Sequence, residues 1–210
     1  ADVFGVAFPF STRDGSDTLI FDQSDAELPK RLLQHAKAEV AAHGAVVDDQ
    51  LLEIGREITG RRIDTAFAHA VLRSDGSYRQ LPDCSEWWWR PRNASRGRNR
   101  LVNTITKVLA ACPAIRIAEL REACRRHIKS DHIAPPTRVV RAICTSLPHL
   151  RVEGDLVERS AHTFPWNDVL NESERLLLAI FERRGPVLDS YTVSEEGIAL
   201  GINENSLTIY

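Results

Sequence analysis

Two arginines and a threonine share one face of a helix that we expect to begin near Pro136. Arg138, Arg141 and Thr145 are spaced three and four residues apart, opposite an apolar stripe. A guanidinium group forks onto the O6 and N7 atoms of guanine, and a threonine hydroxyl hydrogen-bonds several base edges. The pattern therefore indicates contact with base edges in a DNA groove. Its alternative is the solvent-facing side of an ordinary amphipathic helix.

Two other segments offer polar residues for the same kind of contact. An earlier expected helix presents an analogous face made of Arg62, Thr65, His69 and Arg73. Near the C-terminus, Asn203 and Asn205 flank the acidic Glu204 on another expected DNA-facing helix. Both segments are candidates for contact with DNA, with a solvated helix face as the alternative for each.

A stretch rich in arginine lies between the first two of these helices. Within eleven residues the chain holds Arg90, Arg92, Arg96, Arg98 and Arg100. From residue 90 to residue 130 there are eleven Lys or Arg and two Glu, a net +9, whereas the other 16 basic and 27 acidic residues give −11. A block this basic in a chain of net charge −2 indicates a polyanionic partner, and phosphate contact is the expected role of these arginines. The alternative is a solvated basic linker without a partner.

Three consecutive tryptophans end the segment before this stretch. On a strand, Trp87 and Trp89 point to one face and Trp88 to the other. Trp87 and Trp89 would then pack beneath a hairpin while Trp88 stays exposed, and we expect core packing or an interdomain contact for these residues. The alternative is that the exposed Trp88 stacks on a flipped or single-stranded base.

Motifs for catalysis, metal binding or cofactor binding are missing from the sequence. No phosphate-binding loop, GxGxxG, HExxH or GxSxG motif occurs. His127 and His132 lie five residues apart beside a proline break, which is poor metal geometry, and neighbouring basic residues would repel a cation. We therefore expect neither an enzyme nor a metal or cofactor site.

Composition places the chain among globular proteins. Hydrophobic residues make up 43% and charged residues 27%, and no apolar run approaches the roughly 18 residues of a membrane helix. With no signal peptide we expect the cytoplasm, and the absence of methionine suggests a piece of a longer protein. The four cysteines, at 84, 112, 124 and 144, form no CxxC pair, so we expect reduced, buried thiols, with disulfides as the alternative.

The same order of elements occurs twice along the chain. Residues 32–89 and 101–158 each predict three short helices, then a strand, a turn and a second strand. The expected hairpins join 78–81 with 87–89, and 150–152 with 156–158. A further helix begins at Asn171, with Glu174 at capping-box spacing, and ends at Gly185. Together, these helices and hairpins predict a mainly α fold with short β-hairpins, built of tandem units.

The last segment resembles the helix-turn-helix family. Gly197, Gly201 and Leu207 hold the positions of its small residue, its turn glycine and its buried aliphatic residue. The flanking apolar positions are filled by Leu200, Ile202 and Tyr210. Gly197 stands where the family usually has alanine. A glycine allows the tight turn, and a small residue lets the two helices approach closely.

Three short helices followed by a hairpin form the winged-helix arrangement, which both copies resemble. Residues 25 to 210 are similar to bacterial tandem winged-helix segments, and their last part to region 4 of sigma factors. They also resemble HARE-HTH modules attached to restriction and modified-DNA-sensing systems. The resemblance implies binding to double-stranded DNA, directed by sequence or by base modification. Such a module would be the targeting part of a larger bacterial regulator of transcription or defence protein.

The expected division of the chain has four parts. Residues 1–24 form two strands or the tail of a preceding domain, 25–90 a winged-helix unit, 91–160 the basic linker and a second unit, and 167–210 a truncated helix-turn-helix unit. Other domains of the same protein are expected partners, and a membrane is not. The competing interpretation is a protein–protein interaction scaffold whose third helices turn inward. Salt-dependent binding to duplex DNA separates the two.

Overall fold

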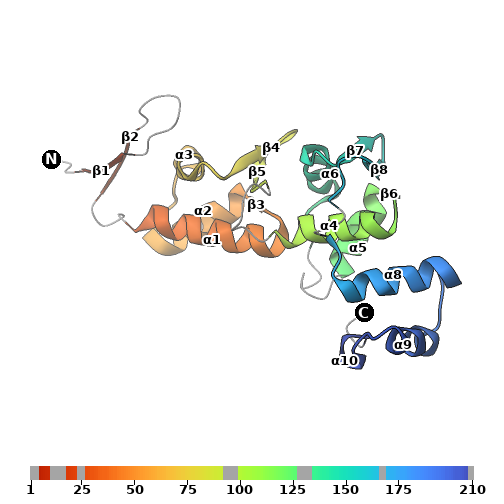
Figure 1. Ribbon diagram of the computed structural model, residues 1–210. Helices are drawn as coiled ribbons and strands as arrows, with labels where there is room; N and C mark the ends of the chain where they lie inside the picture. The colour runs from red at the N-terminus through yellow and green to blue at the C-terminus, as the bar shows by residue number, and fades with distance from the viewer. Residues whose placement is uncertain are drawn as a thin grey trace.

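Figure 1 shows the computed structural model of the chain, in which helices dominate. The structure describes the backbone of residues 5–9 and 18–22 and, apart from the side chain of residue 206, residues 27–91, 99–126, 134–165 and 169–207 in full. Within these ranges the chain also forms one pair of antiparallel strands and two small three-stranded antiparallel sheets. Strands β1 (Gly5–Pro9) and β2 (Thr18–Asp22) pair antiparallel, which confirms the two strands expected there.

The first unit, residues 27–91, has three helices and one three-stranded sheet. Its elements are, in order, α1 (Leu28–His43), β3 (Ala45–Val47), α2 (Asp48–Thr59), α3 (Thr65–Asp75), β4 (Arg79–Leu81) and β5 (Cys84–Trp89). Strand β5 lies between β3 and β4 and is antiparallel to both. The expected hairpin is confirmed as β4–β5, whereas the sequence pattern does not predict β3.

The second unit, residues 99–165, repeats this order. Its elements are α4 (Arg100–Ala111), β6 (Ala114–Arg116), α5 (Ile117–Arg126), α6 (Thr137–Ser146), β7 (Leu150–Glu153) and β8 (Leu156–Arg159). The last strand, β8, is again central, between β6 and β7. The two units therefore share both the order of elements along the chain and the order of strands in the sheet.

Polar caps and a glycine set the ends of these helices. The Asp64 side chain accepts from the backbone N–H of Ala66 at the start of α3. Gly44 closes α1 in the left-handed conformation, at φ 92°. Helix α6 starts directly after its N-cap residue Pro136, where proline is tolerated because the N–H that it lacks would have no partner within the helix.

The third unit, residues 169–207, contains α8 (Glu172–Arg184), α9 (Ser190–Ala199) and α10 (Glu204–Leu207). The capping box of Asn171 and Glu174 is confirmed. Gly201 turns the chain between α9 and α10 at φ 88°. A Cβ on Gly197 would lie 2.9 Å from a methyl group of Leu207, so the missing side chain is what allows this close approach.

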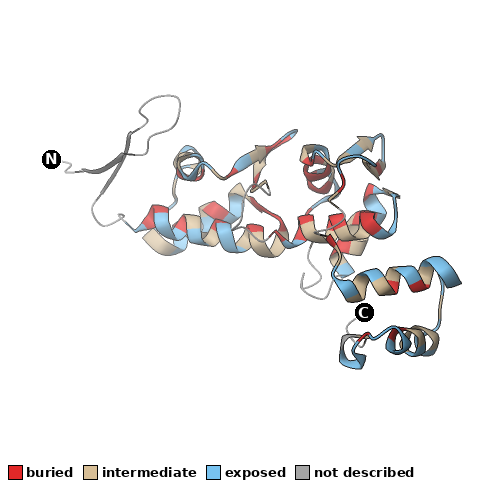
Figure 2. Cartoon of the chain, in the orientation of Figure 1, coloured by how far each residue is buried: buried red, intermediate tan, exposed pale blue. Residues whose placement is uncertain are grey.

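One hydrophobic core joins the first two units. It combines residues of α4, α5, α6 and β8 with four from the first unit's sheet, which are Ala45, Leu81, Cys84 and Trp89. Helix α6 packs on β4 and β5, and α1 contacts α4. In Figure 1, α1 and α4 form a row, and α3 and α6 lie on the same side of that row. Figure 2 shows the buried residues gathered on the sides of the elements that face each other.

Candidate nucleic-acid interface

Helix α6 leaves a narrow polar strip uncovered. Five of its residues are buried in the core that the two units share, namely Val139, Val140, Ala142, Ile143 and Cys144. Arg138 and Thr145 are exposed and Arg141 is half-buried, so the face expected from the helical period is the outer face of the helix. The three side chains are brought together, on a helix that packing fixes on two sides.

Both arginines of this strip have acidic partners. Arg138 Nη2 lies 2.6 Å from Glu86 Oε1 on strand β5 of the first unit. Arg141 donates to the carbonyl oxygen of Gly154 and lies 3.3 Å from Asp155 Oδ1, in the turn between β7 and β8. The side chains of these two pairs are between 36% and 64% exposed, so each pair contributes little to stability.

The corresponding face of α3 is less open than expected. Arg62 is exposed before the helix, and Thr65 is half-buried. His69 Nε2 lies 2.8 Å from Asp48 Oδ1, and its ring packs edge-on against Trp88 with centroids 4.9 Å apart. The expectation that His69 faces DNA is therefore wrong. Its side chain turns inward toward Asp48, at the first turn of α2, which offers it a half-buried acceptor.

The tryptophans alternate as predicted, but Trp88 is not exposed. Its side chain is 1% exposed within the first unit's own core, and its Nε1 donates to Asp48 Oδ1 at 3.2 Å. Trp89 and the half-buried Trp87 pack in the core shared with the second unit. A role for Trp88 in base stacking is excluded. The strand has no solvent face here because each side is covered by a different unit.

The arginine-rich stretch is described only at its ends. Arg90 lies half-buried, its guanidinium carbon 5.3 Å from the centre of the Tyr78 ring. Burial raises the pKa of Tyr78 to about 12, and the positive charge of Arg90 opposes that rise. Arg100 is exposed at the first position of α4. Arg92, Arg96 and Arg98 lie outside the described residues.

Much of the remaining basic block is paired inside the protein. Arg125 and Arg126 both bind Glu122, and their hydrogen bonds lower the pKa of that carboxyl to about 2. Lys107 pairs with Glu174 of α8, and Arg121 donates to the carbonyl oxygen of Pro135 at 2.7 Å. Because Glu122 is already counted in the net +9, it is the pairing of Lys107 with Glu174, outside the block, that lowers the charge offered to a polyanion. Partners far away in the sequence escape any count along the chain.

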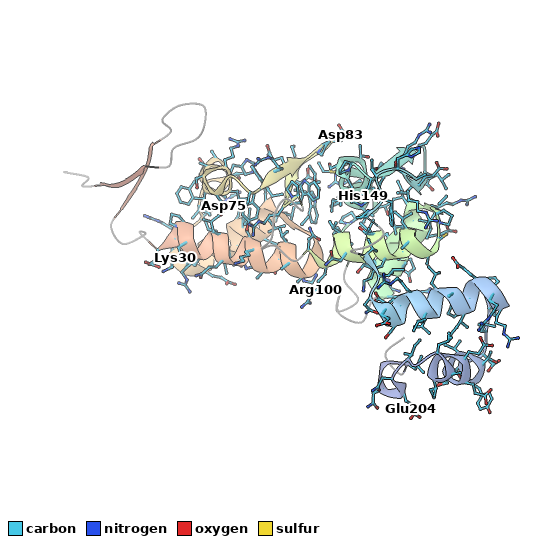
Figure 3. All side chains as sticks on the ribbon, in the orientation of Figure 1. Lys30, Asp75, Asp83, Arg100, His149 and Glu204 are labelled. Atoms are coloured by element: carbon cyan, nitrogen blue, oxygen red, sulfur yellow. The ribbon has the colours of Figure 1, made fainter. Side chains whose placement is uncertain are left out.

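The polar residues expected in the third unit lie at its surface. Asn203, Glu204 and Asn205 are exposed, and the side chain of Asn203 accepts from the backbone N–H of Asn205 at 2.9 Å. Figure 3 shows Glu204 at the outer edge of α10. Asn203 thus lies just before α10 and accepts from its first turn, and the acidic Glu204 lies between the two asparagines.

Three of the four thiols are buried, as expected. Burial raises the pKa of both Cys124 and Cys144 to about 12, and also raises the pKa of Cys84. Cys112 is exposed instead. Across the described residues, no cluster of three His, Cys, Asp or Glu could hold a metal ion, and no helix is long and apolar enough to span a membrane.

Comparison of the chain with protein-family models, with curated proteins and with solved structures finds no match. The case for a function therefore rests on the geometry of the three units.

Proposed function

We propose that residues 27–165 are two tandem winged-helix units that bind double-stranded DNA along the side where α3 and α6 lie. The observation that carries this proposal is the shared architecture. Both units run helix, strand, helix, helix, strand, strand, with the last strand at the centre of the sheet. Three helices capped by such a hairpin are the frame that presents a third helix to the major groove.

The arrangement of the two units supports a single continuous interface. Helices α3 and α6 lie on one side of the α1–α4 row, and β4 and β5 touch α6 between them. Arg62 is an exposed cation before α3, and Arg138 and Arg141 supply guanidinium groups on α6. Because the units share a core, the spacing of their third helices is fixed, which suits one extended site on a duplex.

The test is binding of labelled duplexes by fluorescence anisotropy over a range of salt concentrations. A preferred duplex is first selected from random-sequence pools of plain and methylated DNA. For Arg138→Ala combined with Arg141→Ala, we expect a loss of roughly 1–3 kcal/mol per base contact on that duplex. Binding to unrelated duplexes should weaken much less, because phosphate contacts elsewhere remain.

The matched control is Lys30→Ala combined with Arg31→Ala on α1. This pair also removes two charges and one exposed ion pair, since Lys30 lies 3.3 Å from Glu27. Figure 3 shows Lys30 near the start of α1, at the end of that helix far from α4 and α6. We expect the control to bind the preferred duplex as the parent does. Equal losses in the two double variants would mean that binding follows net charge alone and would refute recognition by α6.

A protein-interaction scaffold is the second candidate, and the hairpin turns favour it. The β4–β5 turn carries the exposed Asp83, and the β7–β8 turn carries Glu153 and Asp155. Figure 3 shows Asp83 at the tip of its hairpin. Carboxylates at these tips would repel the phosphates that a wing usually follows. Absence of salt-dependent binding to any duplex would favour the protein-interaction scaffold over DNA binding.

A further inference from the structure

The third unit holds an unusual share of exposed apolar surface. Among residues with described side chains, the large hydrophobic ones that are exposed are Val187 at 88%, Tyr191 at 68%, Ile198 at 49% and Leu200 at 42%. All four lie in or beside α9. Exposed apolar side chains that gather on one element are typical of a surface that binds another molecule.

Two of these side chains share one face of α9 with a carboxylate. Tyr191, Glu195 and Ile198 are four and three residues apart, so they follow one side of the helix. The Tyr191 hydroxyl donates to Glu195 Oε1 at 2.6 Å, which confirms that the first two lie side by side. The opposite side of α9 packs inward through Val193 and the buried Gly197. We name Tyr191, Glu195 and Ile198 the α9 outer face.

The surroundings of this face are acidic. Residues 186–207 contain four carboxylates and no Lys, Arg or His. Of the four, Glu196 is paired with Arg183 and Arg184 of α8, and Asp189 caps the start of α9. Glu195 and Glu204 are exposed, and neither forms an ion pair with any residue in the described part of the chain.

We propose that the α9 outer face docks a basic, amphipathic segment of another protein. Apolar side chains of that segment would cover Tyr191 and Ile198, and a Lys or Arg would pair with Glu195. A duplex is disfavoured, because the one charge on the α9 outer face is the carboxylate of Glu195 and the nearby Arg183 and Arg184 are paired with Glu196. A second copy is also disfavoured, since a two-fold contact through this face would set carboxylate against carboxylate. The proposal does not depend on DNA binding by the first two units.

The test uses the full chain and a fluorescent, amphipathic helical peptide of leucine and lysine. Its counterpart carries glutamate in place of every lysine. We expect the lysine peptide to bind, and the glutamate peptide to bind at least tenfold more weakly. Tyr191→Ala combined with Ile198→Ala should weaken the lysine peptide about tenfold or more, because central apolar contacts carry most interface energy. The fold should persist in this variant, since both side chains are exposed.

Charge reversal gives a second, independent readout. Glu195→Lys should weaken binding of the lysine peptide and strengthen that of the glutamate peptide. The matched control is Glu57→Lys, which makes the same charge change at an exposed site on α2 of the first unit. It should leave both affinities unchanged.

Three results would overturn the proposal. The first is equal affinity of the lysine peptide for the parent, for Tyr191→Ala combined with Ile198→Ala, and for Glu195→Lys. A lysine peptide that binds none of these three proteins counts as this result. The second is displacement of the bound peptide by duplex DNA, with the duplex affinity lost on Tyr191→Ala and Ile198→Ala. The third is a dimer in analytical ultracentrifugation that the same variant dissociates, which would assign the face to a second copy.

Discussion

The side-chain amide of Asn99 donates to the carbonyl oxygen of Gly44 at 2.9 Å and so ties the end of α1 to the start of α4. The Oδ1 atom of the same buried side chain accepts from the backbone N–H of Val102 at 3.0 Å. One residue therefore satisfies orphan groups at two helix ends. A Cβ placed on Gly44 would lie only 2.5 Å from Cβ of Leu101. The joint between the two units is thus a buried, close-packed contact.

This contact predicts a large difference between two glycine substitutions. Gly44 and Gly60 both close helices at positive φ, 92° and 71°, but no atom lies within 4 Å of a Cβ built on Gly60. Gly60→Ala should cost only the backbone strain, about 1–2 kcal/mol. Gly44→Ala should cost clearly more in urea unfolding, because its methyl group meets the base of the Leu101 side chain. Equal losses of unfolding free energy in the two variants would show that the contact between Gly44 and Leu101 relaxes without cost.

Leu101→Ala supplies the control for that experiment. The leucine is buried, so its loss destabilises the parent chain by roughly 2–5 kcal/mol. In the Gly44→Ala background the same change should cost less, because it removes Cδ2 and Cγ of Leu101, which would lie 2.5 Å and 3.0 Å from the new methyl group, although Cβ remains. A coupling energy of zero between the two substitutions would contradict the close approach.

Helical periodicity predicts the elements well and the outer face of α6 correctly. Arg138, Arg141 and Thr145 follow from the apolar stripe on the other side of the helix, and local signals such as Asn171 locate helix ends. Strands β3 and β6 are too short to show any alternation, and pairing with a distant strand is what makes them strands. Periodicity cannot reveal either.

The sequence fails where contacts between units decide the outcome. Alternation separates Trp88 from Trp87 and Trp89, but it does not reveal that Trp88 lies in the first unit's own core while the other two pack in the core shared with the second unit. The partner of Arg138 is 52 residues away and that of Lys107 is 67 residues away. No rule based on spacing connects residues so far apart. For this reason a net charge counted along the chain is a poor guide to the free cations of the second unit.

The cysteines should react with a thiol reagent in two classes. In the native protein at pH 8, Cys112 should be labelled quickly by Ellman's reagent, because it is exposed. Cys124 and Cys144 should react only as the protein unfolds, because burial blocks access and raises their pKa to about 12. Cys112→Ser should remove the fast phase. Rapid labelling of Cys124 or Cys144 in that variant would contradict the shared core.

Two glycines of the third unit should respond in opposite ways to alanine. Gly197 is inside α9, where alanine is favoured over glycine by about 1 kcal/mol. The new methyl group would lie 2.9 Å from the end of the Leu207 side chain, which is flexible and can shift, and at ordinary contact distance from Ile202, so Gly197→Ala should be neutral or slightly stabilising. Gly201 has φ 88°, so Gly201→Ala should destabilise by about 1–2 kcal/mol despite open space around it. Thermal unfolding followed by circular dichroism measures both.

Acid should loosen the contact between α8 and α9 through one carboxylate. The hydrogen bond from Arg183, and then that from Arg184, holds the pKa of Glu196 below its ordinary value in the folded protein. Because the folded pKa is depressed, the stabilisation is complete above the pKa of the unfolded chain and is lost as the pH falls through the folded pKa. Glu196→Gln should reduce the acid dependence of the third unit's unfolding, followed by NMR signals of α9. Arg183→Gln combined with Arg184→Gln should raise the pKa of Glu196 toward that of a free glutamate, measured by carbon-detected NMR titration. An unchanged titration in this double variant would mean that the two ion pairs do not form in solution.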